Sequence, residues 1–277
     1  MNSAKLPKRQ TENLSLMTTF ARVPGCLKTL HTRNGSTIRY YLQSIAAQDQ
    51  HAPTICFIPG FRSFAFQSLK SEFLLSLSVK QGCSFLTWDH ASQGESTAAS
   101  CPSVKLWYDD ALEVLNQVPS GKLFLVGASM GAWISLLVAN RGPATIKDRL
   151  LGIVGIGAGI NFTEDWLNNE VPVNDPAYVW KRPTEYHANG HYEIPVKMLL
   201  DSRECLMLED EISIPCPVTF VHGRKDADSK LENVVSFAKK IPTASVQIIE
   251  DGDHRLSKES DLTCIEQAII QMIEANK

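Results

Sequence analysis

One short segment constrains the fold of this chain more than any other. An apolar run at 123–126 leads directly into Gly-Ala-Ser-Met-Gly at 127–131, and a stretch with an apolar helical face follows. The pattern G-x-S-x-G between a buried parallel strand and a helix is typical of a tight turn that holds its serine in strained backbone angles. Glycine is needed at both positions because a Cβ would collide with the neighbouring strand or helix. The segment predicts that Ser129 presents its hydroxyl at a helix N-terminus, where negative charge is favoured.

An acid and a base follow Ser129 in the order that a serine nucleophile needs. An apolar strand predicted at 217–221 leads into a loop with Asp226, and a strand predicted at 245–249 leads into a loop with His254. Taken singly, each side chain has the character of a surface or capping residue. Because an open parallel sheet gathers functional groups at the carboxyl ends of its strands, we expect all three at one edge. Their joint placement predicts a catalytic triad in which His254 is the base and Asp226 orients it.

Asp228 is an alternative acid, since it lies two residues beyond Asp226 and an extended segment would place both on one side. We favour Asp226 because it follows the strand directly, three residues after Gly223. Asp228 lies closer to a helix predicted at 230–241, which its carboxylate could cap.

A turn after an earlier strand predicts the oxyanion hole. The β-rich run at 54–58 stops at Pro-Gly-Phe-Arg-Ser, residues 59–63. In this architecture the loop after the third strand and the residue after the nucleophile each supply a backbone N–H. These positions correspond to Phe61 and Met130, and Gly60 would allow the backbone to approach the substrate oxygen. The alternative is an ordinary Pro-Gly turn.

The rest of the chain alternates between strands and helices. We expect a hairpin at 27–43 turned at Asn34-Gly35, strands at 84–88 and 150–156, a helix at 104–116, and a closing helix with Leu262, Ile265, Ile269, Met272 and Ile273 on one face. This order predicts the α/β class, with a mostly parallel, doubly wound sheet.

The segment at about 161–214 breaks this alternation and is rich in tryptophan, tyrosine and proline. It lies where such enzymes carry a small cap over the active site, and Asn189-Gly190 predicts a hairpin within it. His187 and His191 have the spacing of a metal-binding pair. That spacing needs a helix to align both rings, and the Asn-Gly pair between them disfavours one, so no metal site is predicted.

Together these segments resemble the α/β-hydrolase superfamily from about residue 27 to the end. The resemblance rests on Pro-Gly-Phe at 59–61, Trp-Asp at 88–89 ahead of Gly-Glu-Ser at 94–96, the serine turn at 127–133, His-Gly-Arg-Lys-Asp at 222–226 and Gly-Asp-His-Arg at 252–255. Pro-Gly-aromatic in place of His-Gly, with Gly-Asp-His-Arg, is similar to the branch of mitochondrial palmitoyl-protein thioesterases and acyl-glucuronide esterases and its bacterial relatives. The resemblance implies hydrolysis of S-acyl thioesters and acyl-glucuronide esters without a cofactor.

We therefore expect a serine hydrolase that acts through an acyl-serine intermediate on an acylated protein or a small-molecule acyl ester. A carboxylesterase or lipase-like hydrolase of small oxygen esters is the alternative within enzymes. A ligand-binding protein of the same fold without turnover is the alternative of another class, and the intact set Ser129, Asp226 and His254 disfavours it.

Composition sets broader limits. With 277 residues, 44% of them hydrophobic, residues 27–277 can form a single domain with one large core. A net charge of −3 gives no reason to expect nucleic acid or an anionic membrane as partner, and no apolar run has the length of a membrane span. Seven cysteines without a C-x-x-C pair, of which Cys56, Cys83 and Cys216 lie in or beside apolar strands, indicate reduced core thiols.

Residues 1–26 form a separate N-terminal tail in this interpretation. Four basic residues stand against one acid, Glu12, among several serines and threonines. The pattern is that of a mild transit peptide or of an unstructured basic tail. The resemblance favours the mitochondrion as the location, and the cytoplasm is the alternative.

Overall fold

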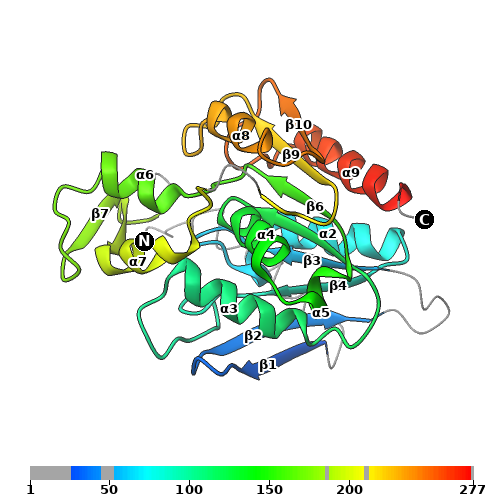
Figure 1. Ribbon diagram of the computed structural model, residues 1–277, viewed down its shortest axis with the longest axis horizontal. Coiled ribbons are helices and arrows are strands. Elements are labelled where there is room, and N and C mark those ends of the chain that lie inside the picture. Colours follow the sequence, from blue (N-terminus) through cyan, green and yellow to red (C-terminus); the bar gives the residue numbers. More distant parts are fainter. Residues whose placement is uncertain (1–25, 45–52, 185–186, 209–211, 276–277) are drawn as a thin grey trace, which may run out of the picture.

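The computed structural model describes residues 26–44, 53–184, 187–208 and 212–275. The predicted tail, residues 1–26, lies outside these residues except for Cys26. Within the described part, one mixed sheet has the strand order β1-β2-β4-β3-β5-β6-β9-β10 (Figure 1). Its strands are β1 (Leu27–His31), β2 (Thr37–Gln43), β3 (Thr54–Ile58), β4 (Ser84–Trp88), β5 (Leu123–Ala128), β6 (Leu150–Ile156), β9 (Val218–Gly223) and β10 (Ala244–Ile249).

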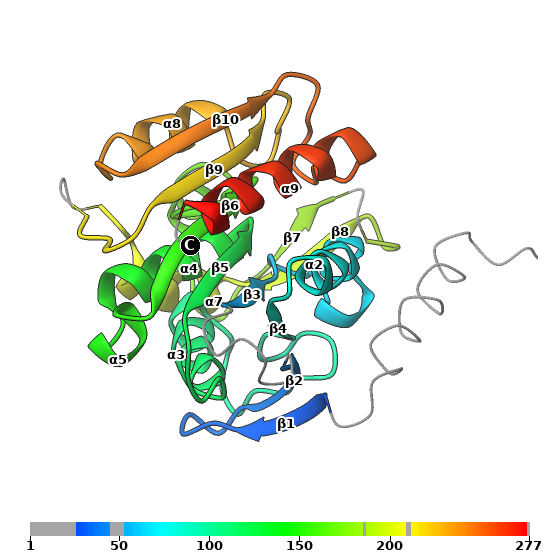
Figure 2. The same cartoon turned by 90° about the vertical axis from the view of Figure 1, so that its right-hand side faces the viewer.

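The sheet is antiparallel at one end and parallel through the rest. Strand β2 pairs antiparallel with β1 and with β4, and every pair from β4 to β10 is parallel. Helices α2 (Leu69–Lys80) and α9 (Glu259–Glu274) pack on one face. Helices α3 (Val104–Leu115), α4 (Met130–Arg141), α5 (Ala144–Lys147) and α8 (Leu231–Ala238) pack on the other (Figure 2). The predicted α/β class with a mostly parallel, doubly wound sheet is confirmed.

The covering of both faces explains the apolar strands. All five residues of β3 are buried, and so are the first five of β5, because side chains that alternate across the sheet meet helices on either side. Strand β9 continues two residues beyond the predicted end, since His222 and Gly223 still pair with Ile248 and Ile249 of β10. The loops after β3, β5, β9 and β10 therefore leave the sheet at the same edge.

The insertion predicted at about 161–214 lies between β6 and β9 and has its own small elements. It contains α6 (Phe162–Asn169), the antiparallel hairpin of β7 (Val179–Pro183) and β8 (His191–Pro195), α7 (Val196–Asp201) and the short helix η2 (Ser202–Cys205). Figure 1 shows it beside one end of the main sheet. The predicted hairpin exists, but its turn is longer than Asn189-Gly190: the N–H of Thr184 donates to the carbonyl of Gly190.

The cysteines in the strands are core residues, as predicted. Cys56, Cys83 and Cys216 are each at most 3% exposed, and burial raises the pKa of Cys216 to about 12. A thiol held in its neutral form by apolar surroundings is a poor nucleophile. As for membranes, the helices within the described ranges are all too short or too polar to span a bilayer.

Candidate active site

Ser129 lies at a strained turn between β5 and α4. Its backbone angles are φ 51° and ψ −116°, a region that non-glycine residues rarely occupy. The two flanking glycines are required by packing. A Cβ on Gly127 would lie 2.3 Å from the carbonyl oxygen of Gly131, and a Cβ on Gly131 would lie 1.9 Å from that of Ile58 in β3. The tight packing of β5, α4 and β3 thus sets the position of the serine.

The structure brings Ser129, His254 and Asp226 together. Nε2 of His254 lies 3.0 Å from Oγ of Ser129, and Nδ1 lies 2.8 Å from Oδ2 of Asp226. A carboxylate can only accept a hydrogen bond, so Nδ1 carries the hydrogen and Nε2 of the neutral ring is free to accept the serine hydroxyl. The Asp226 side chain is fully buried, whereas that of His254 is 19% exposed. This arrangement can remove a proton from a serine hydroxyl.

Asp226 is held by more than His254. Its Oδ1 accepts the backbone N–H groups of Asp228 and Ser229, at 2.9 and 2.8 Å. Nε2 of the fully buried His222 lies 3.3 Å from Oδ2 and 2.8 Å from the carbonyl of Ser229. These contacts fix the direction of the buried carboxylate. No role was predicted for His222; a histidine directly after an apolar strand, four residues before the acid, is the signal that the sequence offered.

Asp228 has a different partner. Its Oδ1 lies 3.3 Å from the Arg182 guanidinium of β7, which also pairs with Glu170 at 3.2 Å. The same guanidinium lies 4.4 Å from the ring centre of Trp166 in α6, in the geometry of a cation–π contact. The idea that Asp228 caps the following helix is wrong, because α8 begins after Lys230 and has no side-chain cap. Asp228 instead forms an ion pair that connects the loop carrying Asp226 to the insertion.

The loop that carries His254 is fixed on both sides. Oδ1 of Asp253 accepts the backbone N–H groups of Arg255 and Leu256, at 3.0 and 2.9 Å. From α2, the Lys70 ammonium donates to the carbonyl of Arg255 and to Oγ of Ser257. Burial lowers the pKa of Lys70 to about 8. Lys70 is a second residue that the sequence analysis did not single out, and its helix gave no local signal.

The turn after β3 lies against Ser129. The N–H of Ser63 donates to the carbonyl of Gly60 at 3.1 Å, and Arg62 takes a positive φ of 56° inside this turn. A Cβ on Gly60 would lie 3.1 Å from Cβ of Ser129, so the absence of a side chain allows the close approach. Phe61 follows Gly60, and Met130 is the first residue of α4. The two predicted oxyanion donors thus belong to the segments that flank the nucleophile.

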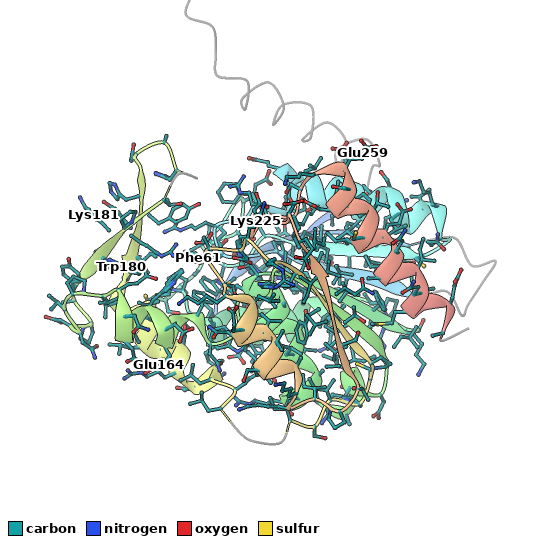
Figure 3. All side chains as sticks on the ribbon, turned by 90° about the horizontal axis from the view of Figure 1, so that it is seen from above. Phe61, Glu164, Trp180, Lys181, Lys225 and Glu259 are labelled. Atoms are coloured by element: carbon teal, nitrogen blue, oxygen red, sulfur yellow. The ribbon has the colours of Figure 1, made fainter. Side chains whose placement is uncertain are left out.

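A cavity of about 570 Å³ opens at Ser129 and His254. Aromatic side chains of the turn and the insertion form part of its wall: Phe61 lies 6.0 Å from Trp166 and 6.2 Å from Tyr192, measured between ring centres. Figure 3 shows Phe61 between Trp180 of the insertion and Lys225 of the loop after β9. Most charged side chains that line the cavity are basic. They are Arg62, Lys70, Arg182 and Arg255, and the single carboxylate among the lining residues is that of Asp228.

His187 lies in the hairpin turn, and His191 is the first residue of β8. Nδ1 of His187 accepts the N–H of Asn189 at 3.3 Å, and Nδ1 of His191 lies 3.0 Å from the carbonyl of Asn189. Across the ranges that the structure covers, no three histidine, cysteine or acidic side chains gather as metal ligands would.

Comparison with known proteins shows that this chain is similar to hydrolases. Residues 55–182 match the family model described as serine aminopeptidase, S33. The mouse palmitoyl-protein thioesterase ABHD10, mitochondrial, is 26% identical over 231 residues, which cover 80% of this chain and 75% of the relative.

Solved structures agree in fold. That of α/β-hydrolase domain-containing protein 10 from mouse superposes with a TM-score of 0.78 at 24% identity, covering 91% of this chain and 99% of the other. A putative hydrolase from Agrobacterium vitis gives a TM-score of 0.77 at 24% identity, covering 89% and 99%.

Proposed function

We propose that this chain, a serine hydrolase of the α/β-hydrolase fold, cleaves acyl thioesters of the S-acyl-protein type, and related acyl esters, through an acyl-serine intermediate. The observation that carries the proposal is the continuous hydrogen-bonded series from Ser129 through His254 to Asp226, with contacts of 3.0 and 2.8 Å. The same geometry argues against a binding protein without turnover.

In the first half-reaction, Oγ of Ser129 attacks the acyl carbon while Nε2 of His254 takes the hydroxyl proton. Asp226 accepts the Nδ1 hydrogen and stabilises the imidazolium that forms. The N–H groups of Phe61 and Met130 bind the oxyanion, each contributing roughly 3 kcal/mol to transition-state stabilisation. The carbon–sulfur or carbon–oxygen bond then breaks, and His254 gives its proton to the leaving group, which departs as a thiol or an alcohol and leaves the imidazole neutral. A thiolate leaves with less help than an alkoxide.

In the second half-reaction, water replaces the leaving group. His254 takes a proton from the water as it attacks the acyl-serine ester, and the same two N–H groups hold the second oxyanion. The intermediate collapses, Ser129 recovers its proton from His254, and the carboxylic acid is released. Every group used belongs to this chain and no cofactor takes part.

The aromatic wall supports an apolar acyl group as substrate. Phe61, Phe162 and Trp166 contact one another, and the Phe162 and Trp166 ring centres lie 4.5 Å apart. Burying an acyl chain there would contribute about 0.8 kcal/mol per methylene. We assign the insertion, about 161–214, as a small cap on a single domain of residues 27–277, and the similarity to a mitochondrial relative supports the mitochondrion as the location.

A second candidate is an acyl ester with a carboxylate on its leaving group, such as an acyl glucuronide. The observation that favours it is the basic character of the cavity wall, where Arg62 and Lys70 lie on the segment after Phe61. Cationic groups around a cavity attract and retain anionic ligands.

A matched substrate panel tests the proposal. Parent protein and Ser129→Ala would be assayed on three substrates with the same acyl group: the decanoyl ester of p-nitrophenol, the decanoyl thioester of a cysteine peptide and decanoyl glucuronide. We expect turnover by the parent on the thioester and none above background by the variant. Equal rates for parent and variant on every substrate would contradict the hydrolase function, and activity confined to the p-nitrophenyl esters would point to a general carboxylesterase.

A further inference from the structure

A buried histidine next to the active site has no role in the mechanism above. His90 is the second residue after β4 and is 1% exposed, and its Nε2 is 2.9 Å from the carbonyl oxygen of Pro59. A carbonyl oxygen only accepts, so Nε2 carries the hydrogen. Burial lowers the pKa of His90 to about 4, so the ring is neutral at pH 7. His90 therefore acts as a fixed donor to the first residue of the turn.

Asp89, the residue before His90, anchors the other end of the turn at 59–65. Asp89 is also 1% exposed, and its Oδ1 accepts the backbone N–H of Ala65 at 2.6 Å. Its Oδ2 accepts the N–H of Glu95 at 3.0 Å. Two consecutive buried side chains thus hold the segment 59–65 at its first carbonyl and at its last N–H.

The direction of the Phe61 N–H follows from these anchors. The peptide between Gly60 and Phe61 is planar and trans, so its N–H points away from the Gly60 carbonyl. That carbonyl accepts the N–H of Ser63, which fixes the peptide within the turn. The internal bond does not place the turn relative to Ser129. The bonds from His90 to Pro59 and from Asp89 to Ala65 do so, because they tie the turn to β4.

Aromatic neighbours prevent the His90 ring from leaving this position. The ring of Trp107 lies 5.9 Å from that of His90 and 6.0 Å from that of Phe61. The Trp107 indole N–H donates to the carbonyl of Ala91 at 2.9 Å, so α3 holds the segment after His90 as well. The carbonyl of Pro59 also faces α4, since a Cβ on Gly131 would lie 2.8 Å from its oxygen.

We propose that His90, together with Asp89, is a positioning residue for hydrolysis: its hydrogen bond to Pro59 holds the Phe61 N–H where the oxyanion forms. This inference rests on the proposed function, because it takes Phe61 as an oxyanion donor. It predicts that loss of the His90 donor weakens binding of the tetrahedral intermediate and leaves binding of the ground-state substrate unchanged.

The test compares variants at His90 with a matched control. His90→Phe keeps a ring and loses the donor, His90→Asn keeps a donor that is too short to reach, and His90→Gln restores one of similar reach. Thr87→Val is the control, because Oγ of Thr87 is a buried donor to another main-chain carbonyl of β3, that of Phe57, at 3.0 Å. For each, kcat, KM, melting temperature and the inhibition constant of a trifluoromethyl ketone analogue of the substrate would be measured. The analogue forms an oxyanion with Ser129.

We expect His90→Phe and His90→Asn to lower kcat roughly 10- to 100-fold with KM unchanged, which is less than the loss caused by removing an oxyanion donor outright. The inhibition constant of the ketone should rise by the same factor. His90→Gln should bring kcat and the inhibition constant most of the way back to the parental values. Thr87→Val should lower the melting temperature without changing kcat or the inhibition constant.

Unchanged kcat in folded His90→Phe or His90→Asn would overturn the proposal, as would a loss of kcat without a matching rise in the inhibition constant. If His90→Phe does not fold, His90→Asn and His90→Gln carry the comparison. Failure of the proposed function is recognised separately, because parent protein and Ser129→Ala would then be equally inactive.

Discussion

The identity of the catalytic acid can be tested with two isosteric substitutions, Asp226→Asn and Asp228→Asn. In Asp226→Asn the amide oxygen is expected at the place of Oδ1, because two backbone N–H groups must be accepted there. The NH2 group then takes the place of Oδ2 and faces Nδ1 of His254, 2.8 Å away in the parent. Nδ1 must become an acceptor, so the ring hydrogen moves to Nε2 and His254 can no longer take the proton of Ser129.

The expected loss in kcat is about 10³- to 10⁴-fold, by analogy with the same substitution in a known triad. That corresponds to roughly 4 to 5.5 kcal/mol in activation free energy. Since the acid acts only in the transition state, kcat and kcat/KM should fall together.

Asp228→Asn serves as the matched control. Its carboxylate pairs with Arg182, and the two side chains are 30% and 15% exposed. A partly exposed ion pair contributes at most about 1 kcal/mol to the free energy of unfolding, so we expect a small loss of stability and little loss of kcat. Steady-state kinetics and urea unfolding of the two purified variants decide the matter. A large loss of kcat in Asp228→Asn, with near-parental turnover in Asp226→Asn, would refute the assignment.

Three further predictions use other features of the molecule. A fluorophosphonate probe should label the parent and not Ser129→Ala, and labelling of the variant would reveal another nucleophile. Lengthening the acyl chain should raise kcat/KM by about fourfold per methylene until the cavity is full, and a flat series from acetyl to decanoyl would contradict an apolar acyl site. Burial raises the pKa of Asp110, which is 1% exposed, to about 6. Between about pH 4 and pH 6 the folded protein then binds more protons than the unfolded chain, so this group lowers the free energy of unfolding as pH rises. Asp110→Asn should remove that slope and raise the free energy of unfolding at pH 7 by on the order of 3 kcal/mol, and equal slopes in urea unfolding of parent and variant would show that Asp110 does not cause it.

Local sequence was sufficient for the parts of the fold that depend on packing between neighbours in the chain. The glycines at 127 and 131 have no room for a Cβ, and the G-x-S-x-G motif alone predicts that requirement. The predicted strands have the expected bounds to within two residues at each end. Strand β9 is the example, since its last two residues look polar or flexible in sequence yet pair with β10.

The parts that sequence could not supply depend on contacts between distant segments. Arg182 is 46 residues from Asp228, and Lys70 is 185 residues from the carbonyl that it binds near His254. His90 and Pro59 are 31 residues apart. In each case the pattern around the residue is that of an ordinary helix, loop or surface charge, so only the three-dimensional structure reveals the partner.

The two neighbouring acids show how the insertion is joined to the catalytic loop. Asp226 is occupied by His254 and by backbone N–H groups of its own loop, whereas Asp228 binds Arg182, which stacks on Trp166. Because Trp166 lines the cavity, a change at Arg182 or Asp228 alters the wall of the cavity without removing the bond between Asp226 and His254. We therefore expect the proposed chemistry to depend on the edge of the sheet, and the choice of substrate to depend on the insertion and its ion pairs. Substitutions at Arg182 should accordingly change KM and the preference among acyl chains before they change kcat.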